Sequence, residues 1–206
     1  SYVTGDHFTY TCGDATRAYA QKKLSLFTRE FLHIRPDLFI ILDKVVSKSP
    51  EYKKRWLLHS IDEPDIDGDA VIITQGKGRL ICRTLLPERV SIKKVGGPGR
   101  EFWVNGQNYP PQKSDPEAGA WRVEISPDQD RTDDIFLHVL LTGDRDLSQM
   151  IPLSVTQDNE QIHIQGEYMG GNIECVFLLD KAPGGRIRIE RDGNIEETEF
   201  YKQSVK

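Results

Sequence analysis

The sequence is poor in the residues that mark metalloproteins and disulfide-rich domains. Its 206 residues include three cysteines, Cys12, Cys82 and Cys175. An odd and widely spaced set cannot form a fully paired disulfide framework, and it lacks the C-x-x-C spacing of a zinc site. Cys82 and Cys175 lie within apolar, strand-like segments, which predicts that they are core residues.

Long hydrophobic runs and excess positive charge are also lacking. The longest apolar run, 38–42, is far too short to cross a bilayer, and the polar residues 1–15 do not resemble a signal peptide. The net charge of −5 argues against a nucleic-acid partner. It also repels acidic polysaccharides at long range, although a local basic cleft overrides net charge within a Debye length.

Catalytic signatures are missing as well. The sequence has no G-x-S-x-G elbow, P-loop, G-x-G-x-x-G, H-x-H or H-E-x-x-H motif. The histidines divide by position, since some lie inside alternating segments and others near segment ends, where sites are more often built. The first group, expected to be structural, is His33, His138 and His163; the second is His7 and His59. A metal site assembled from distant segments, such as His7, Asp14, Asp43 and His59, stays an open alternative, but no metal or cofactor is predicted.

Short alternating or apolar segments separated by turn signals dominate the chain. Hydrophobic residues at 37% and charged residues at 29% are typical of a globular domain. Candidate strands are 24–34, 38–46, 54–60, 70–75, 79–86, 89–95, 100–104, 120–126, 134–142, 161–169, 173–180, 186–191 and 195–201. Turn signals lie at 35–37, 96–99, 105–106, 170–172, 180–185 and 192–194. The best helix candidate is the short segment 14–22.

This pattern predicts an all-β fold, an antiparallel β-sandwich of stacked sheets, because no crossover segments are present for parallel pairing. A weak boundary near 143–152 divides the chain into 1–144 and 145–206. The second part either completes the sandwich or forms a small C-terminal sheet of its own.

Aromatic residues supply the candidate binding site. Pyranose rings pack their apolar faces against aromatic rings, and Trp103 and Tyr109 flank the Asn105-Gly106 turn at the start of a long polar loop, 105–120. We therefore predict that Trp103 and Tyr109 contact carbohydrate, whereas Trp56 and Trp121 are expected in the core. Asp43, inside an apolar segment, is expected to form a structural salt bridge with Arg35 or Arg55.

Several segments in order carry a resemblance to a known family. Residues 29–64 read REFLHIRPDLFIILDKVVSKSPEYKKRWLLHSIDEP, preceded by GDHFTYTCGDATRAY and followed by GRLICRTLLPE, WVNGQNY, WRVEIS and HVLLTGD. Together they resemble the C-terminal β-sandwich part of the heparinase II/III-like polysaccharide lyases, over roughly residues 5–144. Because the sequence starts at Ser1 and not at Met, we expect a fragment of a longer protein.

The resemblance implies a bacterial, periplasmic or secreted lyase that acts on uronic-acid-containing glycans, glycosaminoglycans among them. Family members place an (α/α) toroid before the sandwich and cleave by β-elimination. The uronate carboxylate is neutralised, a Tyr or His takes the C5 proton, and an acid assists the leaving oxygen.

In the family, the catalytic Tyr and His come largely from the toroid. The family's metal-site segment falls upstream of Ser1, so no catalytic or metal residue is assigned to this chain. The expected partners are an acidic polysaccharide and an N-terminal toroid, with no nucleic acid and no membrane. The chain alone is expected to be inactive. The alternatives are an independent carbohydrate-binding module and a structural or interaction β-domain.

Overall fold

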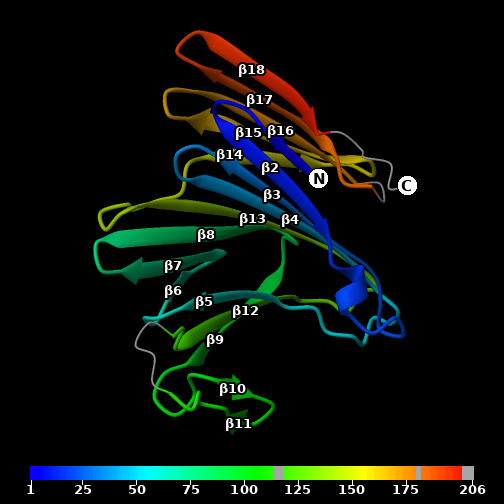
Figure 1. Cartoon of the computed structure of the whole chain (residues 1–206), viewed down its shortest axis with the longest axis vertical. Helices are drawn as coiled ribbons and strands as arrows, with labels where there is room; N and C mark the ends of the chain where they lie inside the picture. Colours follow the sequence, from blue (N-terminus) through cyan, green and yellow to red (C-terminus); the bar gives the residue numbers. More distant parts are fainter. Residues whose placement is uncertain (114–117, 180–181, 201–206) are drawn as a thin grey trace.

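The computed structural model describes residues 1–113, 118–179 and 182–200. Antiparallel strands build three layers, with the largest sheet in the middle (Figure 1). A five-stranded sheet packs on one face of this central sheet, and a three-stranded sheet covers part of the other face. The prediction of an all-β antiparallel sandwich is confirmed.

The strand bounds follow the sheets. The central sheet has the order β1-β2-β3-β4-β13-β8-β7-β6, with β1 Tyr2–Thr4, β2 Phe8–Asp14, β3 Leu24–Ile34, β4 Leu38–Ser47, β13 Asp133–Asp144, β8 Gly78–Leu86, β7 Ala70–Gln75 and β6 Asp65–Asp67. The five-stranded sheet is β14 Leu153–Gln157, β15 Gln161–Tyr168, β16 Gly171–Leu178, β17 Gly185–Arg191 and β18 Asn194–Phe200. The three-stranded sheet has the order β5-β12-β9, with β5 Trp56–Ser60, β12 Trp121–Pro127 and β9 Val90–Gly96. A separate hairpin pairs β10 Trp103–Val104 with β11 Gln107–Asn108.

Strand β4 shows why the central sheet lies in the middle. Successive side chains of a strand point to opposite faces. Leu38, Ile40 and Leu42 belong to the core shared with the five-stranded sheet, which we call the large core. Ile41 and Phe39 face the core shared with the three-stranded sheet, the small core. A strand buried on both faces reads as a nearly continuous apolar run, which is what 38–42 is.

Hairpin turns set the register between neighbouring strands. Asn105-Gly106, Met169-Gly170 and Asp192-Gly193 are two-residue turns in which both residues have positive φ. These are the conformations that connect right-twisted antiparallel strands, and Asn-Gly and Asp-Gly favour them. The turns predicted at 105–106 and 192–194 are confirmed. The turn predicted at 170–172 lies one residue earlier.

Other expectations at the strand level need correction. Only a 3₁₀ turn, Thr16–Ala18, forms within the helix candidate 14–22, because the Asp14 carboxylate accepts the Thr16 amide proton in a local turn. Strands β1, β2, β6, β11 and β14 were not predicted. The predicted turn at 180–185 includes residues 180–181, which lie outside the described part of the chain.

A buried ion pair lies in the large core. Tyr10 Oη donates to Glu30 Oε2 at 2.7 Å, and Lys44 Nζ lies 3.3 Å from Glu30 Oε1 while also donating to the Leu178 carbonyl. Burial raises the pKa of the Glu30 carboxyl, and Lys44 opposes that shift. The ring of Tyr10 stacks on Phe200 of β18 at 4.0 Å, so this cluster fastens the five-stranded sheet to the central sheet.

Both parts of the predicted division contribute to the large core, with Phe8 and Leu32 from 1–144 and Ile162 and Phe177 from 145–206. The boundary at residue 144 stays a prediction. Within the described residues, no helix has the length and hydropathy needed to span a membrane.

Candidate functional site

The two predicted carbohydrate contacts lie at the β10–β11 hairpin. Trp103 opens β10 and is half-buried, whereas Tyr109, one residue after β11, has 56% of its surface exposed. The Tyr109 amide donates to the Phe102 carbonyl, so the Tyr109 backbone is held against the start of the hairpin. The prediction that these residues contact carbohydrate stays a prediction, and residues 114–117 of the adjoining loop lie outside the described part.

Two arginines surround the hairpin. The Arg100 guanidinium lies over the Trp103 ring, 4.8 Å from its centroid. Arg122 Nη2, from the middle strand of the three-stranded sheet, donates to the Trp103 carbonyl at 3.0 Å. Arg122 therefore ties the hairpin to the face of the sheet that points away from the small core.

We call this face the outer face and define it by alternation. Val123 and Ile125 of β12 point into the small core, so Arg122 and Glu124 point outward. Cross-strand register places His59 and Val95 on either side of Arg122, and Leu57 and Lys93 on either side of Glu124. Arg55 continues the outward row of β5, and its Nε lies 3.5 Å from Glu124 Oε2. The outer face thus carries Arg55, Leu57, His59, Lys93, Arg122 and Glu124.

Electrostatics on the outer face are dominated by its cations. Glu124 Oε1 accepts hydrogen bonds from both Nε and Nη2 of Arg122, at 3.0 and 2.7 Å. Partial burial, and then repulsion from Arg122, lowers the pKa of His59 below its ordinary value. An anion bound beside this pair would offset the repulsion from the guanidinium and raise the pKa of the imidazole.

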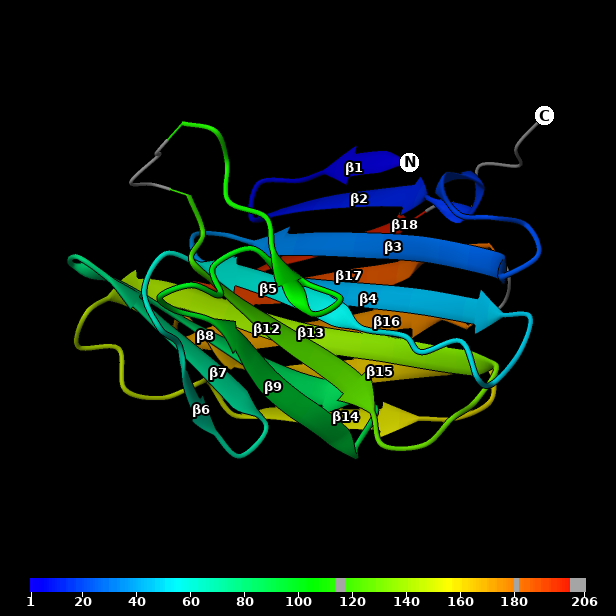
Figure 2. The ribbon, with the colours of Figure 1, turned by 90° about the horizontal axis from the view of Figure 1, so that it is seen from below.

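A second surface lies on the same side of the central sheet, beyond the edge of the three-stranded sheet. Figure 2 shows β1, β2 and β3 extending past β5 with no layer in front of them. The side chains on this face include Tyr2, Phe27, Phe31, His33 and Phe39, and we call it the aromatic face. Phe31 and Phe39 lie 5.8 Å apart, and His33 stacks on Phe39 at 4.4 Å. These rings are only partly buried, and Tyr2 is 67% exposed.

The arginines near the aromatic face are already bonded. Arg29 makes a bidentate pair with buried Asp43, with Nε–Oδ1 at 2.6 Å and Nη2–Oδ2 at 2.5 Å. The partner predicted for Asp43 was Arg35 or Arg55, and this was wrong, because β3 and β4 bring Arg29 directly opposite Asp43. Arg35 instead donates to the carbonyls of Gly5, Asp6 and Phe8.

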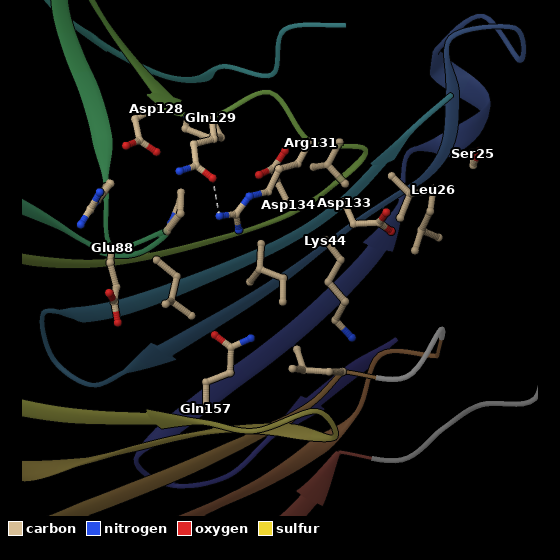
Figure 3. Close-up of a pocket in the computed structure, with 18 residues that line it drawn as sticks. Ser25, Leu26, Lys44, Glu88, Asp128, Gln129, Arg131, Asp133, Asp134 and Gln157 are labelled. Carbon is tan, nitrogen blue, oxygen red and sulfur yellow. Dashed lines mark hydrogen bonds between the residues drawn. The ribbon is translucent and has the colours of Figure 1, made fainter. Parts of the chain in front are cut away.

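A groove of about 980 Å³ lies where β4 ends and β13 begins, away from the β10–β11 hairpin (Figure 3). Its charged lining mixes both signs: Lys44, Arg89 and Arg131 face Glu88, Asp128, Asp133 and Asp134. Lys44 is paired with Glu30, and Asp134 with Lys54 at 2.8 Å. Since none of the described lining residues is aromatic, the groove lacks a surface for stacking a sugar ring.

The histidines and cysteines do not assemble a reactive site. Across the described ranges, no three His, Cys, Asp or Glu residues lie close enough together to hold a metal ion. His7 Nδ1 contacts Glu196 at 3.0 Å, and His138 is fully buried with Nδ1 beside Thr84 Oγ1. Cys82 and Cys175 are buried and free, so the prediction that they are core residues is confirmed.

The predicted core tryptophans differ. Trp56 is 5% exposed and lies 3.9 Å from the ring of His138, as a core residue should. Trp121 is only partly buried, because it lies at the sheet end, over Gly97.

Comparison with known proteins rests on the fold, because no family model matches the chain and no curated protein matches it in sequence. The chain is similar in fold to part of a heparan sulfate lyase. The heparan sulfate lyase HepC from Pedobacter heparinus superposes with a TM-score of 0.53 and 14% identity, over 97% of this chain and 27% of the lyase. A mutant of that lyase gives 0.54 and 13%, over 100% of this chain and 28% of the lyase. The chain therefore spans little more than a quarter of the lyase's length.

The outer face was not predicted, although its signal is present in the sequence. Outward positions alternate in Arg55-Leu57-His59 and in Arg122-Glu124. Each strand alone looks like an ordinary half-exposed strand. The concentration of cations appears only when β5, β12 and β9 are placed side by side, and β12 is far from both partners in the sequence.

Proposed function

We propose that this chain is the non-catalytic β-sheet portion of a polysaccharide lyase. The parent enzyme acts by β-elimination on uronic-acid-containing glycans, and an N-terminal (α/α) toroid carries its catalytic Tyr and His. Support comes from the fold similarity to just over a quarter of a heparan sulfate lyase, and from the family resemblance of residues 5–144.

The observation that carries the proposal is the aromatic face. Isolated domains rarely leave a contiguous group of rings on a sheet face without a covering layer, and such patches mark interaction sites. Here Tyr2, Phe27, Phe31 and Phe39 lie on the same face of the central sheet, and Phe31 and Phe39 pack at the margin of the small core while Tyr2 is exposed. The proposed occupant is the toroid of the same polypeptide.

In this arrangement the chain supports the toroid and lines one side of the toroid's substrate-binding cleft. Its Cys82 and Cys175 thiols and its Tyr10 phenol have pKa values raised by burial, so they are poor proton acceptors at neutral pH. The proposal assigns proton abstraction from C5 to the toroid, as the family mechanism implies. We expect the 206-residue chain alone to release no unsaturated product from a panel of uronic-acid polymers, measured by ultraviolet absorbance.

The test of docking uses exposed residues, so that folding is spared. In the longer polypeptide that the proposal requires, Tyr2→Ser with Tyr19→Ser should lower lyase activity severalfold. Both rings are exposed in this chain, Tyr2 on the aromatic face and Tyr19 at its edge, against Phe27. The matched control is Met169→Ser with Ile195→Ser, exposed to a similar degree on the five-stranded sheet, which should leave activity unchanged. Equal activity of the tyrosine variant and the control would contradict docking at the aromatic face.

A carbohydrate-binding module is the second candidate, favoured by the exposure of Tyr109. It predicts that the chain alone binds a neutral or acidic glycan and that Tyr109→Ala or Trp103→Ala abolishes this binding. It also predicts that the longer polypeptide needs no contact with the aromatic face for activity. The tyrosine variants above therefore separate the two candidates.

A further inference from the structure

We propose that the outer face of the three-stranded sheet, together with the β10–β11 hairpin, binds a chain of anionic polysaccharide. This inference rests on the proposed function and deepens it, because it names the surface through which this part of the lyase meets its glycan. The binding itself is measurable on the 206-residue chain alone.

The charge of the outer face is opposite to that of the protein. The chain carries a net charge of −5, yet the outer face holds Arg55, Lys93 and Arg122 against the single carboxylate of Glu124. A locally positive surface raises the concentration of a polyanion near it despite the net charge, since distant charges are screened beyond a Debye length.

The five-stranded sheet provides the internal contrast. On its outward face, Arg186 pairs with both Glu174 and Glu197, at 2.7 and 3.5 Å, and Arg188 lies 3.5 Å from Glu190. In these pairs three carboxylates face two arginines, so that face carries no excess of cations. An excess of cations on a flat, exposed sheet is a property of the outer face and does not follow from the general composition of the surface.

The spacing suits an extended polymer. Alternate residues of a strand are separated by roughly 7 Å, so the outward row Arg55-Leu57-His59 extends over roughly 13 Å. Arg122 lies on β12, opposite His59. Lys93 lies on β9, opposite Glu124 and one strand further from β5. A glycan with one carboxylate or sulfate per sugar or per disaccharide meets more than one of these cations at once, while an isolated small anion meets one.

The hairpin adds the apolar contact that a sugar requires and a simple anion does not. The Trp103 ring lies beneath the Arg100 guanidinium, and Tyr109 is more than half exposed. The hydrogen bond from Arg122 to the Trp103 carbonyl joins this aromatic end to the cationic sheet. Aromatic rings stack on pyranose faces while arginines bind the charged groups, so the hairpin and the outer face, joined at Arg122, offer both chemistries.

His59 supplies a local reporter. The charged group opposite it is Arg122 of β12, Leu57 lies two residues away on its own strand, and a Cβ added at Gly119 would lie 3.5 Å from the His59 Cβ. A bound polyanion offsets the repulsion from Arg122 and favours the protonated imidazole. Binding should therefore raise the pKa of His59, and it should strengthen as the pH falls through that pKa.

The experiment measures binding of the 206-residue chain to heparin oligosaccharides and to polygalacturonate, by calorimetry at low and at moderate salt. Arg55→Ala with Lys93→Ala should weaken binding about tenfold at low salt and flatten its salt dependence, because two cationic contacts are lost. The control Lys48→Ala with Lys77→Ala removes the same charge from exposed positions elsewhere and should bind like the wild type. Trp103→Phe should bind nearly as well as the wild type, and Tyr109→Ala should weaken binding several-fold.

Each outcome has one meaning. Equal weakening in the control pair shows that only net charge matters and overturns the proposal, as does unchanged binding in the Arg55/Lys93 pair. Equal affinity for single-stranded DNA or for anionic vesicles, lost in the same variant, also overturns the assignment to a polysaccharide. An NMR titration in which heparin leaves the pKa of His59 unchanged excludes contact at that position. Failure here leaves the docking test of the proposed function untouched, because that test changes different residues, Tyr2 and Tyr19 at the aromatic face.

Discussion

Replacing His138 by glutamine should make the protein's stability less sensitive to acid. His138 is fully buried in the small core, with Nδ1 3.1 Å from Thr84 Oγ1 and its ring 3.9 Å from that of Trp56. Burial, and then repulsion from Arg29, lowers its pKa to about 3 in the folded protein. In the unfolded chain the pKa of a histidine is about 6.5.

The direction follows from proton counting. Between pH 3 and pH 6.5 the unfolded chain carries a proton on His138 and the folded protein does not, so stability rises with pH in this window. The contribution is complete above pH 6.5 and is lost as the pH falls. At pH 5, about 1.5 units below the unfolded pKa, the loss for this one group is roughly 2 kcal/mol, since one pKa unit corresponds to about 1.4 kcal/mol.

Urea unfolding at pH 7.5 and pH 5 measures this loss. With a slope of about 2 kcal/mol per molar urea, the wild-type midpoint should fall by about 1 M more than that of His138→Gln. The variant is less stable at pH 7.5, because it loses the stack on Trp56. It retains an amide opposite Thr84, and the comparison rests on the change with pH and not on the absolute value. A difference between variant and wild type that is the same at both pH values would refute the reasoning.

Two further comparisons test the packing. Glu30→Gln should cost about 3–5 kcal/mol of unfolding free energy, because it removes a buried carboxylate from beside the buried Lys44 ammonium. Asp43→Asn should cost about 1–2 kcal/mol, because Arg29 is 46% exposed and stays hydrated. Denaturant titration of both variants ranks them, and the opposite order would contradict this account. Gly97→Ala should lower the melting temperature more than Gly99→Ala, since both glycines have positive φ but only at Gly97 would a Cβ meet the Trp121 ring, at 2.9 Å. Equal shifts in calorimetry would show that the ring moves aside freely.

The fold class was predictable because the alternation of side chains is local. Segments such as 24–34 and 161–169 carry their burial pattern within a few residues, and the structure places β3 at 24–34 and β15 at 161–168. Strand β2 was missed although Phe8, Tyr10 and Cys12 alternate with threonines, because its outward residues made the N-terminal region read as polar.

The layering was less accessible to sequence reasoning. Strands β5 and β12 pair across some sixty residues of chain, and nothing in either segment specifies the partner. The same reason explains the error at Asp43. The chain offers several arginines at suitable sequence distances, and only the register of β3 against β4 selects Arg29.

The candidate site was partly accessible. Trp103 and Tyr109 could be picked out because the Asn105-Gly106 turn and the proline-containing loop mark an exposed hairpin. The cations of the outer face and the rings of the aromatic face could not, since both surfaces are formed by residues from strands that only the tertiary structure brings together.

The burial of β4 and β13 on both faces has a consequence for how this sequence can change over time. In the flanking sheets every second residue meets water, so about half of the positions accept substitution at little cost. In β4 and β13 most side chains are buried in one core or the other. A polar residue in place of a buried apolar one would lack a hydrogen-bond partner there. Sequence divergence among related chains should therefore be slowest in these two strands and fastest on the solvent-exposed faces of the flanking sheets. New binding specificities would then arise on the outer sheets while the central sheet persists.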